Sequence, residues 1–120
     1  MKAALMIGLL LATTNTLAGA PAPATQREVA ALFNALEHSG CSFNRNGSWY
    51  SAAQASEHLH RKYDYLLRKK LVPNTEAFIE RAASQSSFTG TPYRVRCPGA
   101  AEVESRTWFS IRLRQVRAEK

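Results

Sequence analysis

The chain has 120 residues, with 16 Lys or Arg against 9 Asp or Glu, and therefore a formal net charge of +7. This length predicts one small domain, and two cysteines are too few to form a cysteine-based metal cluster. The excess of basic residues favours contact with anionic surfaces, namely lipid head groups, acidic polysaccharide or acidic partner proteins.

The first 24 residues have the pattern of a secretory signal peptide with a short Pro/Ala tether. Lys2 precedes the apolar run Ala3–Ala12, which is too short to span a hydrocarbon core of about 30 Å as a helix. Cleavage is expected after Ala18 or after Ala24, because a cut after Ala20 or Ala22 would leave proline as the first residue. We therefore expect a soluble periplasmic or secreted protein with no transmembrane segment, and we do not expect nucleic acid as its partner.

The two cysteines, Cys41 and Cys97, are 56 positions apart. In an oxidising compartment this pair predicts a structural disulfide. Closing a loop of this length is expected to stabilise the domain by about 4 kcal/mol. A redox-active pair is the alternative, but the sequence has no Cys-x-x-Cys motif.

The tether is expected to include Ala20–Thr25, and the first helix is predicted to follow it from Gln26. The helix's apolar residues recur at i, i+3, i+4 and i+7. They are Val29, Leu32, Phe33 and Leu36. The helix should end at Ser39-Gly40, since glycine readily adopts the left-handed cap conformation.

A hairpin is the clearest local prediction. Asn46-Gly47 is the dipeptide that a type I′ turn prefers, and large residues flank it. Arg45 should lie at the tip of this hairpin. Ser51 then predicts the start of a long helix, because Gln54 three residues later completes a capping box. The apolar face of this helix consists of Ala52, Ala55, Leu59, Tyr63, Leu66 and Leu67.

The second half of the chain predicts a third helix, a strand and a final segment of two possible types. The third helix is capped by Asn74 or Thr75, and the strand is Tyr93–Cys97. Residues 105–117 favour a helix with an apolar face, although alternation at Phe109, Ile111 and Leu113 leaves a strand open.

Together these elements predict an α+β fold that is mainly helical. It should have about four helices, a small antiparallel sheet of two or three strands, and one disulfide. Residues 25–120 would form a single globular domain.

Several short motifs resemble the YfeK family of small exported bacterial proteins, a family of unknown function. In the first half these motifs are Phe43-x-Arg45-Asn46-Gly47 and Ala55-x-x-His58-Leu59-x-x-Lys62. In the second half they are Thr75-Glu76-Ala77-Phe78-Ile79, Ala83-Ser84-x-Ser86, Thr89-Gly90-x-Pro92-Tyr93 and Pro98-Gly99. The resemblance covers about residues 28–113. It implies an exported protein of related fold, and it supplies no reaction.

The candidate binding residues combine a cationic stripe with hydroxyl groups. His58 and Lys62 are one helical turn apart, and Arg45 precedes that helix on the hairpin. If the hairpin and the loop 84–89 fold over this helix, Ser86 and Ser87 would join these three residues in one pocket. Arginine and hydroxyl groups suit a carboxylate or a phosphate. The alternative is purely structural, in which His58 and the serines bind nearby backbone.

The predicted function is therefore a non-enzymatic binding or interaction module for an anionic envelope ligand or a partner protein. The alternative is a small hydrolase or transferase, with His58 as general base and a serine of the 84–87 loop as nucleophile. It lacks an evident carboxylate to orient His58, so binding is favoured over catalysis. No cofactor or metal site is expected, since His58 and His60 diverge on a helix.

Overall fold

The computed structural model describes residues 20–119. The signal peptide predicted for the first residues, with the cleavage site after Ala18, therefore lies outside the described residues. The helices are α1 (Pro23–Glu37), α2 (Ala52–Arg68), α3 (Thr75–Ala82) and α4 (Ser105–Ala118). The strands are β1 (Ser42–Arg45), β2 (Ser48–Ser51), β3 (Arg94–Arg96) and β4 (Val103–Glu104).

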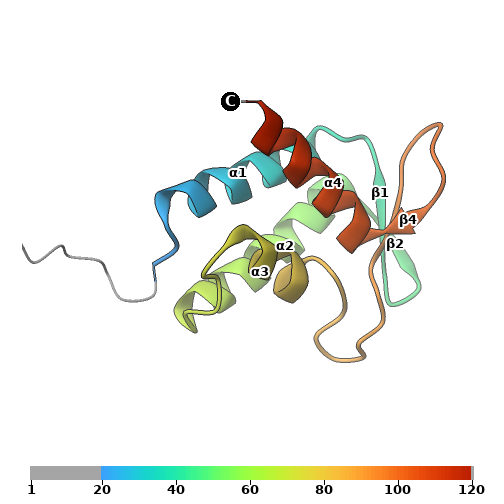
Figure 1. The fold of residues 1–120 in the computed structure, drawn as a ribbon. Helices are drawn as coiled ribbons and strands as arrows, with labels where there is room; N and C mark the ends of the chain where they lie inside the picture. The colour runs from blue at the N-terminus through green and yellow to red at the C-terminus, as the bar shows by residue number, and fades with distance from the viewer. Residues whose placement is uncertain (1–19, 120) are drawn as a thin grey trace, which may run out of the picture.

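The strands form one antiparallel sheet in the order β2-β1-β3-β4. Helix α2 packs on β1 and β2, and α4 packs on β3 and β4. Helices α1 and α3 pack on these two helices and on each other, so the helices gather beside the sheet (Figure 1). The predicted α+β class, with four helices and one disulfide, is confirmed.

Local signals place the boundaries of the hairpin and of α2 as predicted. Asn46 and Gly47 have φ values of 51° and 85°, which are the positive angles that a type I′ turn needs. Ser51 and Gln54 form the predicted capping box at the start of α2. Asn74, rather than Thr75, is the N-cap of α3.

The expected tether at residues 20–25 is wrong in its second half, because α1 begins at Pro23. Proline is favoured in the first helical turn, where its missing N–H and its fixed φ are harmless. Thr25 is buried, with 6% of its surface exposed. The alternative cleavage position after Ala24 lies inside the first turn of this helix.

The sheet has one strand more than the two or three predicted. Strand β4 is two residues long, and it pairs with β3 through Val95 and Val103. The sequence pattern predicts no strand in this stretch. A two-residue strand has no periodicity of its own, so its pairing depends on a partner distant in the fold.

The final segment is the helix α4, and the strand alternative is wrong. Trp108, Phe109 and Leu113 are buried, with 6%, 0% and 4% of their surface exposed. Ile111, which a strand would place on the same face as Phe109, is 40% exposed. The burial therefore follows the helical period.

Phe78 lies at the centre of the core with none of its surface exposed. Its ring meets those of Phe33, Tyr63 and Phe109 at centroid distances of 5.4, 5.3 and 6.4 Å, each close to edge-on. This arrangement is the one that aromatic quadrupoles prefer. The predicted disulfide joins Cys41, just before β1, to Cys97, just after β3.

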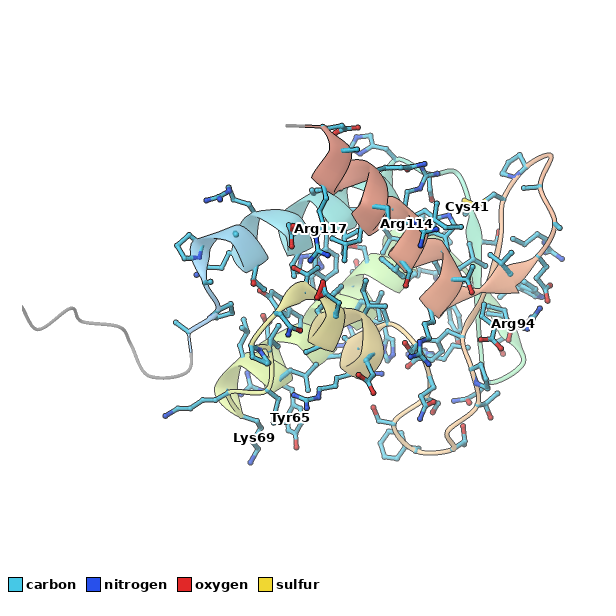
Figure 2. All side chains as sticks on the ribbon, viewed as in Figure 1. Cys41, Tyr65, Lys69, Arg94, Arg114 and Arg117 are labelled. Atoms are coloured by element: carbon cyan, nitrogen blue, oxygen red, sulfur yellow. A yellow bond between two sulfur atoms is a disulfide. The ribbon has the colours of Figure 1, made fainter. Side chains whose placement is uncertain are left out.

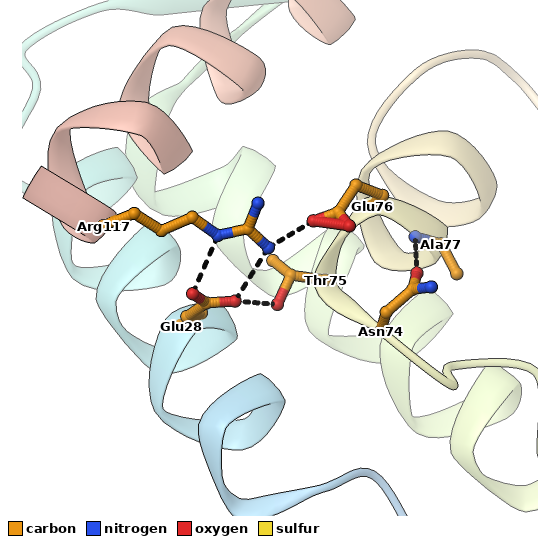
Figure 3. Close-up of polar contacts among 6 residues, drawn as sticks. All are labelled: Glu28, Asn74, Thr75, Glu76, Ala77 and Arg117. Carbon is orange, nitrogen blue, oxygen red and sulfur yellow. Dashed lines mark hydrogen bonds and ion pairs between the residues drawn. The ribbon is translucent and has the colours of Figure 1, made fainter.

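A polar cluster joins α1, α3 and α4 (Figure 3). Arg117 near the end of α4 forms ion pairs with Glu28 of α1 and Glu76 of α3. The buried Thr75 hydroxyl donates to Glu28 at 2.6 Å. These contacts hold together the segments at the two ends of the described chain.

Candidate functional site

The five candidate residues line one cavity of about 370 Å³, which we call the loop cavity. It lies between the β1–β2 hairpin, the first half of α2 and the loop that follows α3. The candidates among its lining residues are Arg45, His58, Lys62, Ser86 and Ser87. The structure thus brings them together as the sequence predicted. That they bind a ligand stays a prediction.

His58 is held from both sides of its ring. Its Nδ1 lies 2.5 Å from Nη1 of Arg45, and its Nε2 lies 3.0 Å from the hydroxyl oxygen of Tyr93. Because a guanidinium only donates, Nδ1 must accept, and the neutral ring therefore carries its proton on Nε2. His58 then donates to Tyr93. Arg45 also lies over the ring of Tyr50, 4.6 Å from its centroid.

Lys62 continues this network one turn along α2. Its ammonium donates to the hydroxyl oxygen of Tyr93 at 3.1 Å and to the carbonyl of Gln85 at 3.0 Å. The Tyr93 oxygen thus accepts two hydrogen bonds, one from His58 and one from Lys62. Its own proton has no acceptor among the described residues and remains free to donate to a ligand.

Ser86 and Ser87 have different surroundings in the loop. Ser86 is buried, and its hydroxyl oxygen accepts from the Asn46 side chain at 3.3 Å and from the backbone N–H groups of Phe88 and Thr89. It therefore shapes the loop as well as lining the cavity. Ser87 is exposed and lines the cavity without a structural contact of this kind.

The electrostatics of the cavity are those of converging cations. Burial lowers the pKa of His58 to about 4, and the nearby charges of Arg45, Lys62 and Arg61 add to this effect. Burial, followed by the charge of Arg45, lowers the pKa of Lys62 to about 8. Burial also raises the pKa of Tyr93. At neutral pH His58 is therefore uncharged, Lys62 is charged and Tyr93 keeps its proton.

No carboxylate lies among the described residues that line the loop cavity. The ion pairs found in residues 20–119 use Arg94 and Arg117, which lie elsewhere. Arg45 and Lys62 thus face the cavity without an acidic partner there. Buried or half-buried cations are usually paired, so this arrangement is typical of a site for an anion.

The geometry gives less support to His58 as a general base. Its ring nitrogens contact Arg45 and Tyr93, and no hydrogen bond joins it to a serine of the 84–87 loop in the described part of the chain. Ser84 instead donates to the carbonyl of Ile79. A base with a pKa near 4 is also weak at neutral pH, whereas an efficient general base has a pKa near the working pH.

Sequence reasoning missed Tyr93 and Asn46 as parts of the site. Tyr93 was assigned to a strand, and Asn46 only to its turn. Tyr93 is 5% exposed, and its hydroxyl joins His58 to Lys62. Both residues belong to the motifs that carried the family resemblance, which was the available signal.

The described residues also bear on membrane spanning and on metal binding. Between residues 20 and 119, no helix combines the length and apolar character needed to cross a membrane. Over the same range, no three His, Cys, Asp or Glu side chains lie close enough together to hold a metal ion.

Comparison with known proteins gives a family without an assigned activity. No curated protein and no solved structure matches the sequence significantly. Residues 23–117 match the model of a family of unknown function, DUF5329. This match covers α1 through nearly the whole of α4, and the chain therefore belongs to the DUF5329 family.

Proposed function

We propose that this protein is an exported, non-enzymatic binding module whose loop cavity holds an anionic group, a carboxylate or a phosphate. The group would belong to an envelope component or to a partner protein. The observation that carries the proposal is the convergence of Arg45 and Lys62 on a cavity whose described lining has no carboxylate.

The hydrogen-bond donors around the cavity favour a ligand group that accepts hydrogen bonds. Arginine and lysine only donate, and their contacts leave the hydroxyl proton of Tyr93 free to donate as well. Ser87 adds an exposed hydroxyl. A ligand group that accepts many hydrogen bonds and carries negative charge completes such a set, and carboxylates and phosphates have these properties.

The charges also favour an anion. Arg45 and Lys62 repel each other, and this repulsion contributes to the lowered pKa of Lys62. An anion bound between them would offset that repulsion and raise the pKa of Lys62. Phe88, which is 99% exposed, also lines this cavity. A ligand larger than its anionic group would therefore contact an apolar ring beside the cations.

Export and the closer relationship to YfeK-like proteins are parts of the same proposal. The signal-like pattern of the first residues supports export, and the Cys41–Cys97 disulfide is compatible with an oxidising compartment. Within DUF5329, the hairpin and α2 motifs support a place among YfeK-like proteins. The anionic component would then be found in the cell envelope.

The first test measures binding of sulfate, a stable oxyanion, by two-dimensional NMR. The double variant Arg45→Met/Lys62→Met removes both cavity cations. Its matched control, Lys69→Met/Arg114→Met, removes the same charge from exposed positions at the end of α2 and on α4 (Figure 2). We expect the first pair to weaken binding at least about tenfold, and the control less than about twofold. Equal effects would show that only net charge matters, and the proposal would be wrong.

The second test concerns the envelope. We expect the wild-type protein to be retained with the envelope fraction after osmotic shock, and the Arg45→Met/Lys62→Met variant to be released. The Lys69→Met/Arg114→Met variant should behave as the wild type does. Retention of the cavity variant at the wild-type level would exclude this cavity as the attachment site.

A further inference from the structure

A second cavity, which we call the Ser105 cavity, lies beside the loop cavity and has a volume of about 190 Å³. The two cavities share Arg45, Tyr50, His58 and Tyr93 as lining residues. A ligand group bound to Arg45 would therefore border both cavities. A larger ligand could extend from one into the other.

The hydroxyl of Ser105 is the unexplained group in this cavity. Ser105 is the first residue of α4 and is 1% exposed. Its oxygen is the one buried side-chain polar atom, among the described residues, that has no hydrogen-bond partner. A buried hydroxyl without a partner is costly and rare in native proteins. Ser105 is among the residues that line the cavity, so a group bound there is the candidate partner of this hydroxyl.

Three apolar side chains share the remaining lining with the polar side chains of Asn44 and Gln54. Phe43, Ala55 and Leu59 are 5%, 8% and 3% exposed and belong to the core. An engineered apolar cavity of about 150 Å³ holds one benzene molecule. A cavity of about 190 Å³ is therefore large enough for one six-membered ring.

The charged residues of the Ser105 cavity limit the ligand to one negative charge. Arg45 and Arg61 are the cations, and Glu57 is the one carboxylate among the described residues of its lining. A second anionic group on the ligand would meet the negative charge of Glu57. A monoanion with a neutral ring avoids this repulsion.

We infer that the Ser105 cavity binds the ring of a small aryl carboxylate that bears a ring hydroxyl. The carboxylate lies at Arg45, and the ring hydroxyl bonds to Ser105. This inference rests on the proposed function, because Arg45 supplies the positive charge for both. It adds the class of ligand, which the cationic cavity alone does not define.

The test compares four carboxylates as NMR probes of the full disulfide-bonded chain. Phenylacetate should bind at least about tenfold more tightly than acetate, because its ring is buried. 4-Hydroxyphenylacetate should gain about a further fivefold from one hydrogen bond. 1-Naphthylacetate carries two fused rings, which exceed the cavity, and it should bind no more tightly than acetate.

Two variants test the contribution of the Ser105 hydroxyl and that of the cavity space separately, and each has a control on the same helix. Ser105→Ala should bind 4-hydroxyphenylacetate no better than phenylacetate, whereas Ser110→Ala should keep the wild-type preference. Ala55→Met fills the Ser105 cavity and should remove the advantage of the ring. Ala53→Met places the same side chain at an exposed position and should change nothing.

Sulfate distinguishes failure of this inference from failure of the proposed function. Ala55 does not line the loop cavity, so Ala55→Met should bind sulfate as the wild type does. If sulfate binds but phenylacetate binds no better than acetate, this inference is wrong and the proposed function stands. If sulfate does not bind the wild type, both are wrong. If Ala55→Met does not fold, the comparison of phenylacetate with 1-naphthylacetate on the wild type decides the size of the site.

Discussion

Replacing Arg45 by methionine should raise the pKa of His58. Nη1 of Arg45 lies 2.5 Å from Nδ1 of His58, so a protonated ring would face a guanidinium directly. Two unit charges about 4 Å apart repel by about 1 kcal/mol in water and about 4 kcal/mol in a protein-like medium. For half-buried His58 we take the lower part of this range. Since 1.36 kcal/mol corresponds to about one pH unit, the pKa should rise by about one unit.

The rise is expected to be incomplete, because burial is the largest cause of the lowered pKa and remains in the variant. Lys62 and Arg61 also remain. The same reasoning gives the pH dependence of stability. In the wild type the unfolded chain binds a proton at His58 below about 6.5, whereas the folded chain does so only near 4. Acidification between these values therefore destabilises the fold, and this loss should be smaller in Arg45→Met.

NMR chemical shifts of the histidine ring protons, followed from pH 3 to pH 8, measure these pKa values. Circular dichroism across the same range checks that the chain stays folded. A wild-type pKa of His58 near 6.5, or the same value in Arg45→Met, would refute the convergence of cations on this cavity, and with it the basis of the proposed function.

Four further predictions test the site and the fold. Sulfate binding should weaken as pH rises through about 8, because Lys62 then loses its charge. Reduction of the Cys41–Cys97 disulfide should lower the free energy of unfolding by about 4 kcal/mol. Arg117→Met should lower it by about 1 kcal/mol, since its ion pairs are partly exposed but form a network. Asn46→Gly should leave the melting temperature nearly unchanged but weaken sulfate binding, because glycine keeps the turn and loses the contacts to the loop.

Each of these has its own control. Sulfate does not titrate between pH 6 and 10, so a pH-dependent affinity reports on the protein, and Lys62→Met should show no such dependence. Urea unfolding with and without reductant measures the contribution of the disulfide. Arg114→Met matches Arg117→Met on the same helix, and an equal loss in both would exclude the network. Unchanged amide exchange in the 84–91 loop of Asn46→Gly would show that Asn46 does not hold it.

Features encoded by neighbouring residues could be predicted from the sequence. The Asn46-Gly47 turn and the Ser51–Gln54 capping box each depend on two to four residues, and the structure has both where the sequence placed them. The helical repeat alone likewise predicts that His58 and Lys62, four residues apart, lie on the same face of α2. The hairpin and the loop then had to close over that side, and the shared cavity shows that they do.

Features that depend on distant segments could not be predicted. Val103 pairs with Val95 only because a turn returns the chain beside β3. Tyr93 reads as an ordinary strand residue, and its hydroxyl reaches His58 and Lys62 only through the packing of α2 on the sheet. Likewise, the lack of a hydrogen-bond partner for the Ser105 hydroxyl depends on which segments pack around it. The spacing of residues along the chain does not indicate which distant segments come into contact.

Asn46 belongs both to the turn, which could be predicted from the sequence, and to the contacts with the loop after α3, which could not. Its positive φ is needed for the turn, yet its side chain also donates to Ser86 and accepts from Thr89 at 2.9 Å. The residue that sets the register of the hairpin therefore also holds the loop against it. Because Arg45 precedes this turn and Ser86 follows α3, the contacts of Asn46 help to set the spacing between cation and hydroxyl, together with the hydrogen bond from Lys62 to the carbonyl of Gln85. The turn residue and the helix residue thus hold the loop from two sides, which explains how a site can form from three segments far apart in the chain.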